Sequence, residues 1–187
     1  MFEVLDLFIP EREFWDNVNE EFKYTKPTTL HLKHSLMSLT RWEQKYKRKF
    51  LSEGPTTVEE TLYYIKCMTM NREPIDDLVY QSITNDDLQK VVDYIKDPMT
   101  ATFIPKRRKN RDKDDEPLSS ELIYYYMTAL NIPFECEKWH LNNLLTLIEI
   151  ASIKNEPEDQ NKRSSSEIMK EYSALNKARR AALNSKG

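Results

Sequence analysis

Glycine is almost absent from this sequence, and its scarcity excludes several common classes of protein. Only two glycines occur, Gly54 and Gly187. Phosphate-binding loops need glycine where the backbone approaches the ligand closely, so none of the familiar glycine-rich nucleotide-binding motifs can form here. Sandwiches and barrels with many tight turns also use glycine heavily, and the sequence argues against them.

Cysteine and long apolar runs are scarce too. Two cysteines in 187 residues do not make a disulfide framework, which indicates a reducing cytosolic setting. No run approaches the roughly 18 consecutive apolar residues of a membrane-spanning helix, so we expect no membrane partner. The first residues, MFEVLDLFIPEREFW, carry acids where a secretory signal places basic residues. We therefore expect no signal peptide.

The chain has no strong excess of charge of either sign. Its formal net charge is −3, although charged residues make up 32% of the sequence. Such a balance creates no overall field that would favour nucleic acid or a membrane surface. The hydrophobic fraction of 39% is sufficient for a core, and the length suits one domain or a domain with a tail.

Most of the sequence has the periodicity of helices, except for a short β-forming segment at the N-terminus. Residues 1–30 contain FEVLDLFIP and most of EFKYTKPTTLHL, which predict a small hairpin-like element. Over about residues 30–50 the apolar positions recur every three or four residues, which predicts an amphipathic helix. The stretch TTVEE then predicts a helix capped by Thr56 or Thr57, and TNDDLQKVVDYIKDP predicts another capped by Thr84.

The second half of the sequence predicts a loop, two longer helices and a tail. Residues 99–117 are rich in proline and charge, as in a connecting loop. The stretch SSELIYYYMTALN predicts a helix capped by Ser119 or Ser120. Residues 135–154 predict a helix so apolar that we expect it to be central. The apolar stripe near the C-terminus is too narrow to hold a helix by itself, so a peripheral helix is predicted there.

The expected fold is therefore mainly α. It is a helical bundle with a small N-terminal β-hairpin-like element and a peripheral C-terminal helix. The predicted parts are residues 1–30 for the β element, residues 31–155 for the helical core domain, and residues 156–187 for the linker and C-terminal helix.

Cys136 and His140 are the pair most suggestive of chemistry. On one helix, residues four apart share a face. A structural zinc ion would need two further ligands, which could come from His31, His34 and Cys67. A cysteine nucleophile with a histidine base is a second reading, but no motif surrounds the cysteine. The preferred interpretation is that Cys136 packs as a small apolar residue and that His140 forms hydrogen bonds at the rim.

Two other features carry weaker signals. Six basic residues in the eight positions 106–113 could contact phosphates, but acids crowd against them and no aromatic residue is interleaved for base stacking. A solvated loop is favoured over nucleic-acid binding. Adjacent carboxylates lie at predicted helix starts, where capping explains them. Without a nucleotide loop, a metal-ligand spacing or a nucleophile motif, we expect neither an enzyme nor a cofactor.

The run Tyr124, Tyr125 and Tyr126 spreads around its predicted helix at steps of about 100°, so at most two of these side chains can be buried. We expect Tyr126 to pack in the core. Aromatic residues with a polar tip suit interfaces. Tyr124 and Tyr125 are therefore predicted to form a binding surface.

Five stretches together resemble the tail assembly chaperone family of long-tailed, siphovirus-like bacteriophages. The similarity covers nearly the whole chain and lies in local phrases, not in a catalytic motif. The stretches are LHLKHSLMSLTRWEQKYKRKFL (30–51), TVEETLYYIKCMTMN (57–71), YIKDPMTATFIP (94–105), LIYYYMTALNIPFECEKWHLNNLLTLIEI (122–150) and ALNKARRAALNSKG (174–187).

The resemblance implies a non-enzymatic helical protein made in the host cytoplasm during infection. Such a chaperone binds the tape measure protein and keeps it soluble while the tail tube assembles, and it is not expected in the mature virion. In the family, a frameshift-extended form often recruits the tail tube protein. A homo-oligomer is compatible with this role. Helix-in-groove packing would cover apolar stripes of the partner, and weak binding in many copies would allow later displacement.

The contact surface that we expect combines two parts of the chain. It comprises Tyr124, Tyr125 and Trp139, together with Tyr172, Leu175, Arg179 and Arg180 of the C-terminal helix. Core packing competes with binding as the role of Trp139. Two other functions stay open. One is a structural virion protein, such as a tail connector or a baseplate-associated component, and the other is a nucleic-acid-binding regulator that uses residues 106–113.

Overall fold

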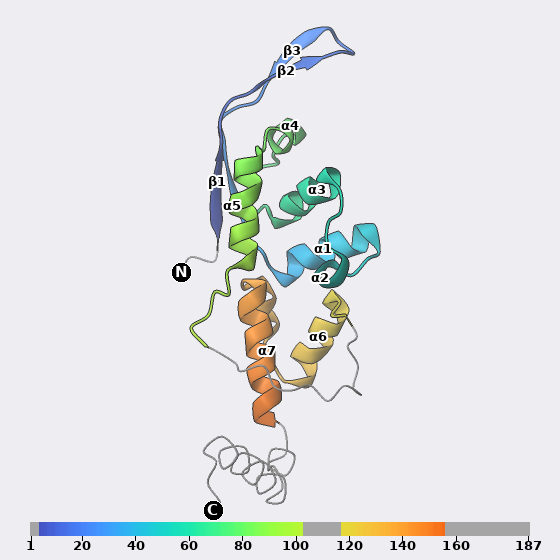
Figure 1. The fold of residues 1–187 in the computed structure, drawn as a ribbon, viewed down its shortest axis with the longest axis vertical. Helices are drawn as coiled ribbons and strands as arrows, with labels where there is room; N and C mark the ends of the chain where they lie inside the picture. Colours follow the sequence, from blue (N-terminus) through green and yellow to red (C-terminus); the bar gives the residue numbers. More distant parts are fainter. Residues whose placement is uncertain (1–3, 103–116, 156–187) are drawn as a thin grey trace, which may run out of the picture. The chain divides into compact units, whose positions relative to one another are not determined.

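The computed structural model describes residues 4–102 and 117–155 (Figure 1). The strands are β1 (Leu5–Ile9), β2 (Glu13–Asp16), β3 (Glu21–Tyr24) and β4 (Thr28–Leu32). The helices are α1 (Leu36–Tyr46), α2 (Phe50–Glu53), α3 (Val58–Met68), α4 (Asp77–Gln81), α5 (Asn85–Lys96), α6 (Ser120–Ala129), the 3-10 helix η1 (Phe134–Lys138) and α7 (Leu141–Asn155).

Helices make up most of the regular structure of the described residues, and the strands all lie near the N-terminus. The prediction of helices together with a small N-terminal β element is confirmed, but the arrangement is a mixture of helices and strands, and the described residues do not form a clear all-helical bundle. The predicted C-terminal helix lies outside the described residues. None of the helices in residues 4–102 and 117–155 combines the length and apolar character needed to cross a membrane.

The four strands belong to one long hairpin whose ladder is interrupted once. β1 pairs antiparallel with β4, and β2 pairs antiparallel with β3. The register that sets Ile9 opposite Thr28 continues into the second pair, which places Pro10 opposite Pro27. Because proline has no N–H to donate, the ladder breaks at this point. The outer part of the hairpin, residues 11–26, is called the arm below, and it extends beyond α3, α4 and α5 (Figure 1).

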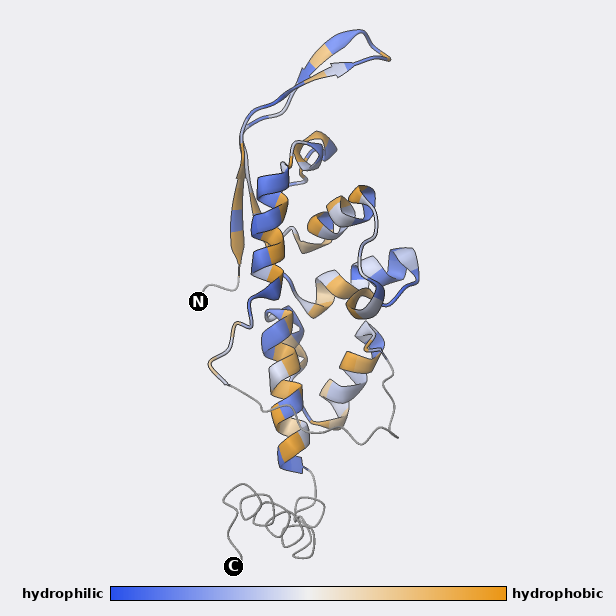
Figure 2. Cartoon of the chain, in the orientation of Figure 1, coloured by the Kyte–Doolittle hydropathy of each residue, from blue (hydrophilic) through white to orange (hydrophobic). Residues whose placement is uncertain are grey.

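One face of the β1–β4 pair forms a wall of the core. Alternate residues of both strands are buried there, namely Leu7, Ile9, Leu30 and Leu32. α3 packs on β4 and α5 packs on β1, and α5 alternates hydrophilic and hydrophobic residues as an amphipathic helix does (Figure 2). The core also contains large side chains from the helices, including Trp42, Tyr64, Ile65, Met68, Val91 and Tyr94. Burial of this apolar surface is the main favourable term in folding.

The helix predicted over about residues 30–50 begins later in the structure than predicted. Residues up to Leu32 belong to β4, and α1 begins only at Leu36. Ser35 caps α1 by accepting a hydrogen bond from the N–H of Ser38. Leu32 fits a helical spacing with Leu36 and also a strand spacing with Leu30, and the pairing of both leucines with β1 selects the strand.

Local capping signals predicted three helix starts correctly. The Thr57 side chain accepts from the N–H of Glu60 at the start of α3. Thr84 forms a reciprocal capping box with Asp87 at the start of α5. Ser119 caps α6. Each of these bonds joins residues three apart, so the sequence contains the whole interaction.

Glu43 is a buried carboxylate that joins three helices. It lies on α1, and only 7% of its surface is exposed. Its Oε1 accepts a hydrogen bond from the N–H of Phe50 at 2.9 Å, and its Oε2 accepts one from the N–H of Ser120 at 2.8 Å. Phe50 begins α2, which has no side-chain cap of its own, and Ser120 begins α6. One side chain therefore satisfies backbone donors at two helix N-termini.

We expect Glu43→Ala to lower the free energy of unfolding by about 2–4 kcal/mol, because both backbone N–H groups lose a charged acceptor. Urea unfolding followed by circular dichroism measures the change. Gln44→Ala is the matched control, since Gln44 is exposed on the next position of α1 and should change stability by less than about 0.5 kcal/mol. Equal losses in the two variants would contradict this role for Glu43.

Candidate functional site

The structure leaves an aromatic surface exposed on α6 and η1. Exposed fractions are 64% for Tyr125, 57% for Phe134 and 41% for Trp139, which follows η1. The rings of Tyr124 and Phe134 lie 6.3 Å apart, and those of Tyr125 and Tyr126 lie 5.7 Å apart. Tyr124, Tyr125, Tyr126, Phe134 and Trp139 are together called the α6–η1 surface. Three of its residues are predicted contact residues.

The phase of α6 explains which tyrosines reach the surface. Ile123 and Met127 are fully buried, and their spacing of four residues defines the inner side of the helix. Tyr126 is 38% exposed, so the prediction that it packs in the core is wrong. Tyr124 is half-buried and its hydroxyl donates to the Glu137 carboxylate at 2.8 Å. Burial, together with this acceptor, raises the pKa of Tyr124 to about 12, so its hydroxyl keeps its proton at neutral pH.

The helix predicted over residues 135–154 starts later than expected. Residues 134–138 form η1 instead, and α7 begins at Leu141, whose N–H donates to the His34 carbonyl at 2.9 Å. Cys136 and His140 therefore do not share a helix. Cys136 is buried as predicted, but His140 is fully buried and does not lie at the rim. The expectation of a central helix is also wrong, because only Leu141 and Leu144 of α7 are buried.

His140 instead faces His34 inside the protein. Their ring centroids lie 5.2 Å apart. His34 Nδ1 is 2.6 Å from the Tyr64 hydroxyl, and His140 Nε2 donates to the Tyr94 carbonyl at 3.2 Å. Burial, with a smaller contribution from His140, lowers the pKa of His34 to about 3. These contacts tie the start of α7 to the β4–α1 connection, to α3 and to α5.

The four-ligand arrangement considered for zinc is not assembled. His31 lies on β4, where its Nδ1 is 2.6 Å from an Asp6 carboxylate oxygen, and it shares no helix face with His34. Cys67 and Cys136 are both buried, and burial raises the pKa of each thiol, which disfavours the reactive thiolate. Within residues 4–102 and 117–155, no group of three or more His, Cys, Asp or Glu side chains is placed to hold a metal ion.

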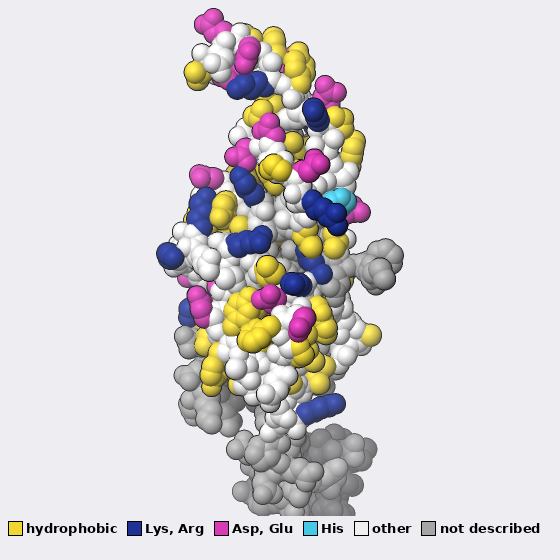
Figure 3. Space-filling model, turned by 180° about the vertical axis from the view of Figure 1, so that it is seen from behind, with side chains coloured by type: hydrophobic (Ala, Val, Ile, Leu, Met, Phe, Trp, Pro, Cys, Tyr) yellow, Lys and Arg dark blue, Asp and Glu magenta, His cyan; other side chains and the backbone are white. Residues whose placement is uncertain are grey.

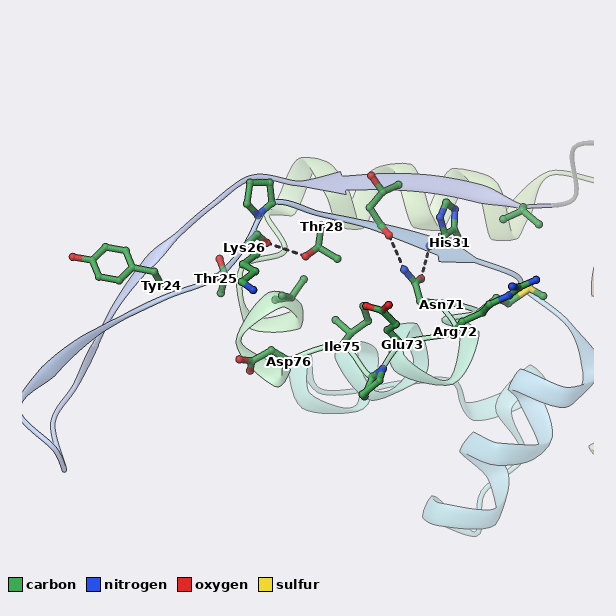
Figure 4. A pocket seen from close by; sticks show the side chains of 16 residues that line it. Tyr24, Thr25, Lys26, Thr28, His31, Asn71, Arg72, Glu73, Ile75 and Asp76 are labelled. Carbon is green, nitrogen blue, oxygen red and sulfur yellow. Dashed lines mark hydrogen bonds between the residues drawn. The ribbon is translucent and has the colours of Figure 1, made fainter.

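A cavity of about 970 Å³ lies where the hairpin passes the segment that joins α3 to α4 (Figure 4). The Asn71 side chain closes the edge of β4 beside it, because Oδ1 accepts from the N–H of His31 and Nδ2 donates to the Thr29 carbonyl, both at 2.9 Å. The charged residues that line the cavity are of both signs, namely Lys26, Arg72, Glu73 and Asp76. This mixture does not favour one class of small ligand.

The arm carries a second aromatic surface, and its residues are not among the predicted contact residues. Trp15 and Phe22 meet edge to face with ring centroids 4.8 Å apart, yet they are 51% and 55% exposed. Tyr24 is 60% exposed, and its hydroxyl donates to Glu13 at 2.8 Å. Hydrophobic side chains are visible on the arm at the top of Figure 3. The alternation of aromatic and charged residues in EFKY was a sequence signal for a strand, but it did not show that the aromatic side would remain uncovered.

The remaining predicted contact residues, Tyr172, Leu175, Arg179 and Arg180, lie outside the described residues, as does the basic cluster at 106–113. Of the predicted contact residues that the structure describes, Tyr124 and Tyr125 lie on α6, and Trp139 directly follows η1. Comparison with family models, curated proteins and solved structures finds no match for this chain.

We expect stability to fall as the pH drops from 6.5 toward 3, because in this range the unfolded chain protonates His34 and the folded chain does not. The slope from this residue is about 0.7 kcal/mol per pH unit at pH 6.5 and approaches about 1.4 kcal/mol per pH unit near pH 5. Urea unfolding between pH 6.5 and 5 should show a shallower slope for His34→Gln than for the original protein.

Tyr64→Phe serves as the control for this measurement. It removes the hydroxyl that contacts His34 but leaves the histidine buried, so the protein should be less stable at every pH while its slope is retained. An unchanged slope in His34→Gln would show that His34 does not control this pH dependence.

Proposed function

We propose that this protein is a tail assembly chaperone of a long-tailed bacteriophage, which binds the tape measure protein and keeps it soluble during assembly of the tail tube. The sequence resemblance supports this role along nearly the whole chain. The observation that carries it is the α6–η1 surface, where tyrosine, phenylalanine and tryptophan side chains remain exposed on an ordered helical framework. The protein acts in the host cytoplasm by binding and makes or breaks no covalent bond.

The α6–η1 surface suits an amphipathic helix as its partner. Tyr125 and Phe134 offer apolar rings at 64% and 57% exposure, so covering them removes apolar area from water. Tyr124 is held by Glu137, and a side chain that is already ordered loses less entropy on binding. Aromatic residues of this kind dominate the energetics of protein interfaces.

A small surface of this kind binds weakly, which is an advantage for a chaperone that must leave. Many copies along one long partner would hold it in solution through their combined effect. Tail tube subunits could then displace them one at a time. A frameshift-extended form that recruits the tube protein would bring the displacing subunits to the same place.

The arm favours a second candidate, a structural virion protein such as a tail connector or a baseplate-associated component. An exposed two-stranded arm with aromatic residues can reach a neighbouring subunit in a permanent assembly. The protein composition of purified virions separates the two functions. A chaperone should be absent or far below stoichiometric there, whereas a virion component should be present in a fixed copy number.

Co-expression with the tape measure protein of the same phage tests the proposal. We expect the tape measure protein to remain soluble and to be captured in a complex with this chain. Replacing Tyr125 and Phe134 together with serine should weaken the complex about tenfold or more, because it removes two exposed aromatic contacts.

Val58→Ser is the matched control for this experiment, since Val58 is a 70% exposed apolar residue on α3. It should leave the complex unchanged. An insoluble tape measure protein with no captured complex would argue against the chaperone function. An equal effect of the Val58 variant would argue against the α6–η1 surface as its site.

A further inference from the structure

We infer that two copies of this chain associate through their arms, with β3 of one copy pairing antiparallel with β3 of the other about a two-fold axis at Phe22. The inference rests on the hydrogen-bonding edge, the charges and the aromatic side chains of the arm. It does not depend on the proposed function.

The outer edge of β3 is available for pairing. The N–H of Thr25 donates to the Arg12 carbonyl at 2.9 Å, which makes these two residues a hydrogen-bonded pair of the hairpin. Bonded and non-bonded pairs alternate along an antiparallel ladder. The backbone N–H and C=O groups of Phe22 and Tyr24 therefore point away from β2. All four residues of β3 are exposed.

Charge selects one register for this pairing. With Phe22 opposite Phe22 of the second copy, Glu21 lies opposite Lys23 on both sides of the axis. Moving the axis to Lys23 sets two lysines opposite each other, and moving it to Glu21 sets two glutamates opposite each other. Like charges in direct opposition destabilise a strand pair. Only the register centred on Phe22 combines outward-facing backbone groups with opposite charges.

The edge of β2 does not offer an equivalent arrangement. Its outward-facing backbone groups belong to Glu13 and Trp15, and a two-fold axis at Trp15 would set Phe14 opposite Asp16. An axis at Glu13 would set two glutamates opposite each other. Pairing of β2 with β3 of another copy would be head-to-tail and would not close into a dimer. The β3–β3 pair is therefore the arrangement that the arm favours.

The same pairing places the exposed aromatic residues side by side. Trp15, Phe22 and Tyr24 share one face of the arm with Glu13, because pairs of facing residues project on the same side of a sheet. Joining two arms makes one four-stranded sheet with the two Phe22 side chains adjacent at its centre. Opposed aromatic residues on a sheet face attract each other. An edge strand that would otherwise be open becomes paired.

Sedimentation equilibrium of the full chain tests this inference. The contact is small, so we expect a reversible dimer with a dissociation constant between about 10 μM and 1 mM. Glu21→Lys and Lys23→Glu should each weaken association about tenfold or more, because each sets like charges opposite each other twice. Glu11→Lys changes the net charge as Glu21→Lys does but lies outside β3, so it should leave the dimer intact.

Charge exchange distinguishes a specific pairing from damage to the arm. An equimolar mixture of Glu21→Lys with Lys23→Glu restores opposite charges at both positions, and so does the double variant in a single chain. Both should associate about as strongly as the original protein. A monomer at all concentrations up to 1 mM, single variants that associate normally, or failure of both the mixture and the double variant would overturn the inference. If the original protein is monomeric and the Phe22→Pro variant no longer binds the tape measure protein, the inferred dimer is wrong. The outer edge of β3 then pairs with a strand of that partner instead.

Discussion

The hydrogen bonds of the Glu43 carboxylate are the constraint on which the helical part of this protein depends. Taking a carboxylate out of water is costly unless its lone pairs are satisfied. Here the N–H groups that start α2 and α6 satisfy them, and the positive ends of both helix dipoles point to the same charge. Ser120 follows Glu43 by 77 residues in the sequence, so this contact fixes the N-terminus of α6 next to α1. The position of the tyrosines on α6 depends on this contact.

The histidine pair is the second tie between distant segments. His34 and His140 fix the start of α7 against the β4–α1 connection, α3 and α5, and their bonds go to Tyr64, to Tyr94 and to backbone groups. The side chains that most suggested catalysis or metal binding are thus engaged inside the structure. The groups that remain exposed are aromatic rings on α6, on η1 and on the arm. Because exposed aromatic side chains suit protein interfaces, we propose that these surfaces bind partners.

Features that depend on residues a few positions apart were predictable. Thr57, Thr84 and Ser119 cap helices because each side chain reaches an N–H three residues ahead. Expectations failed where the decision lay with a distant partner. The β4 strand extends to Leu32 because β1 pairs with it, and α7 starts at Leu141 because the His34 carbonyl accepts its first N–H. Tyr126 is exposed because Ile123 and Met127 face inward instead.

The sequence by itself determined the mixture of helix and N-terminal strand, the helix caps and the burial of Cys136. All of these depend on local backbone preferences and on hydrophobic periodicity. Only the tertiary structure decided that Glu43 would cap two helices, that two histidines would meet, and that the aromatic residues of the arm would remain uncovered. Such contacts join residues far apart in the chain, and the spacing of residue types does not specify which distant groups will meet.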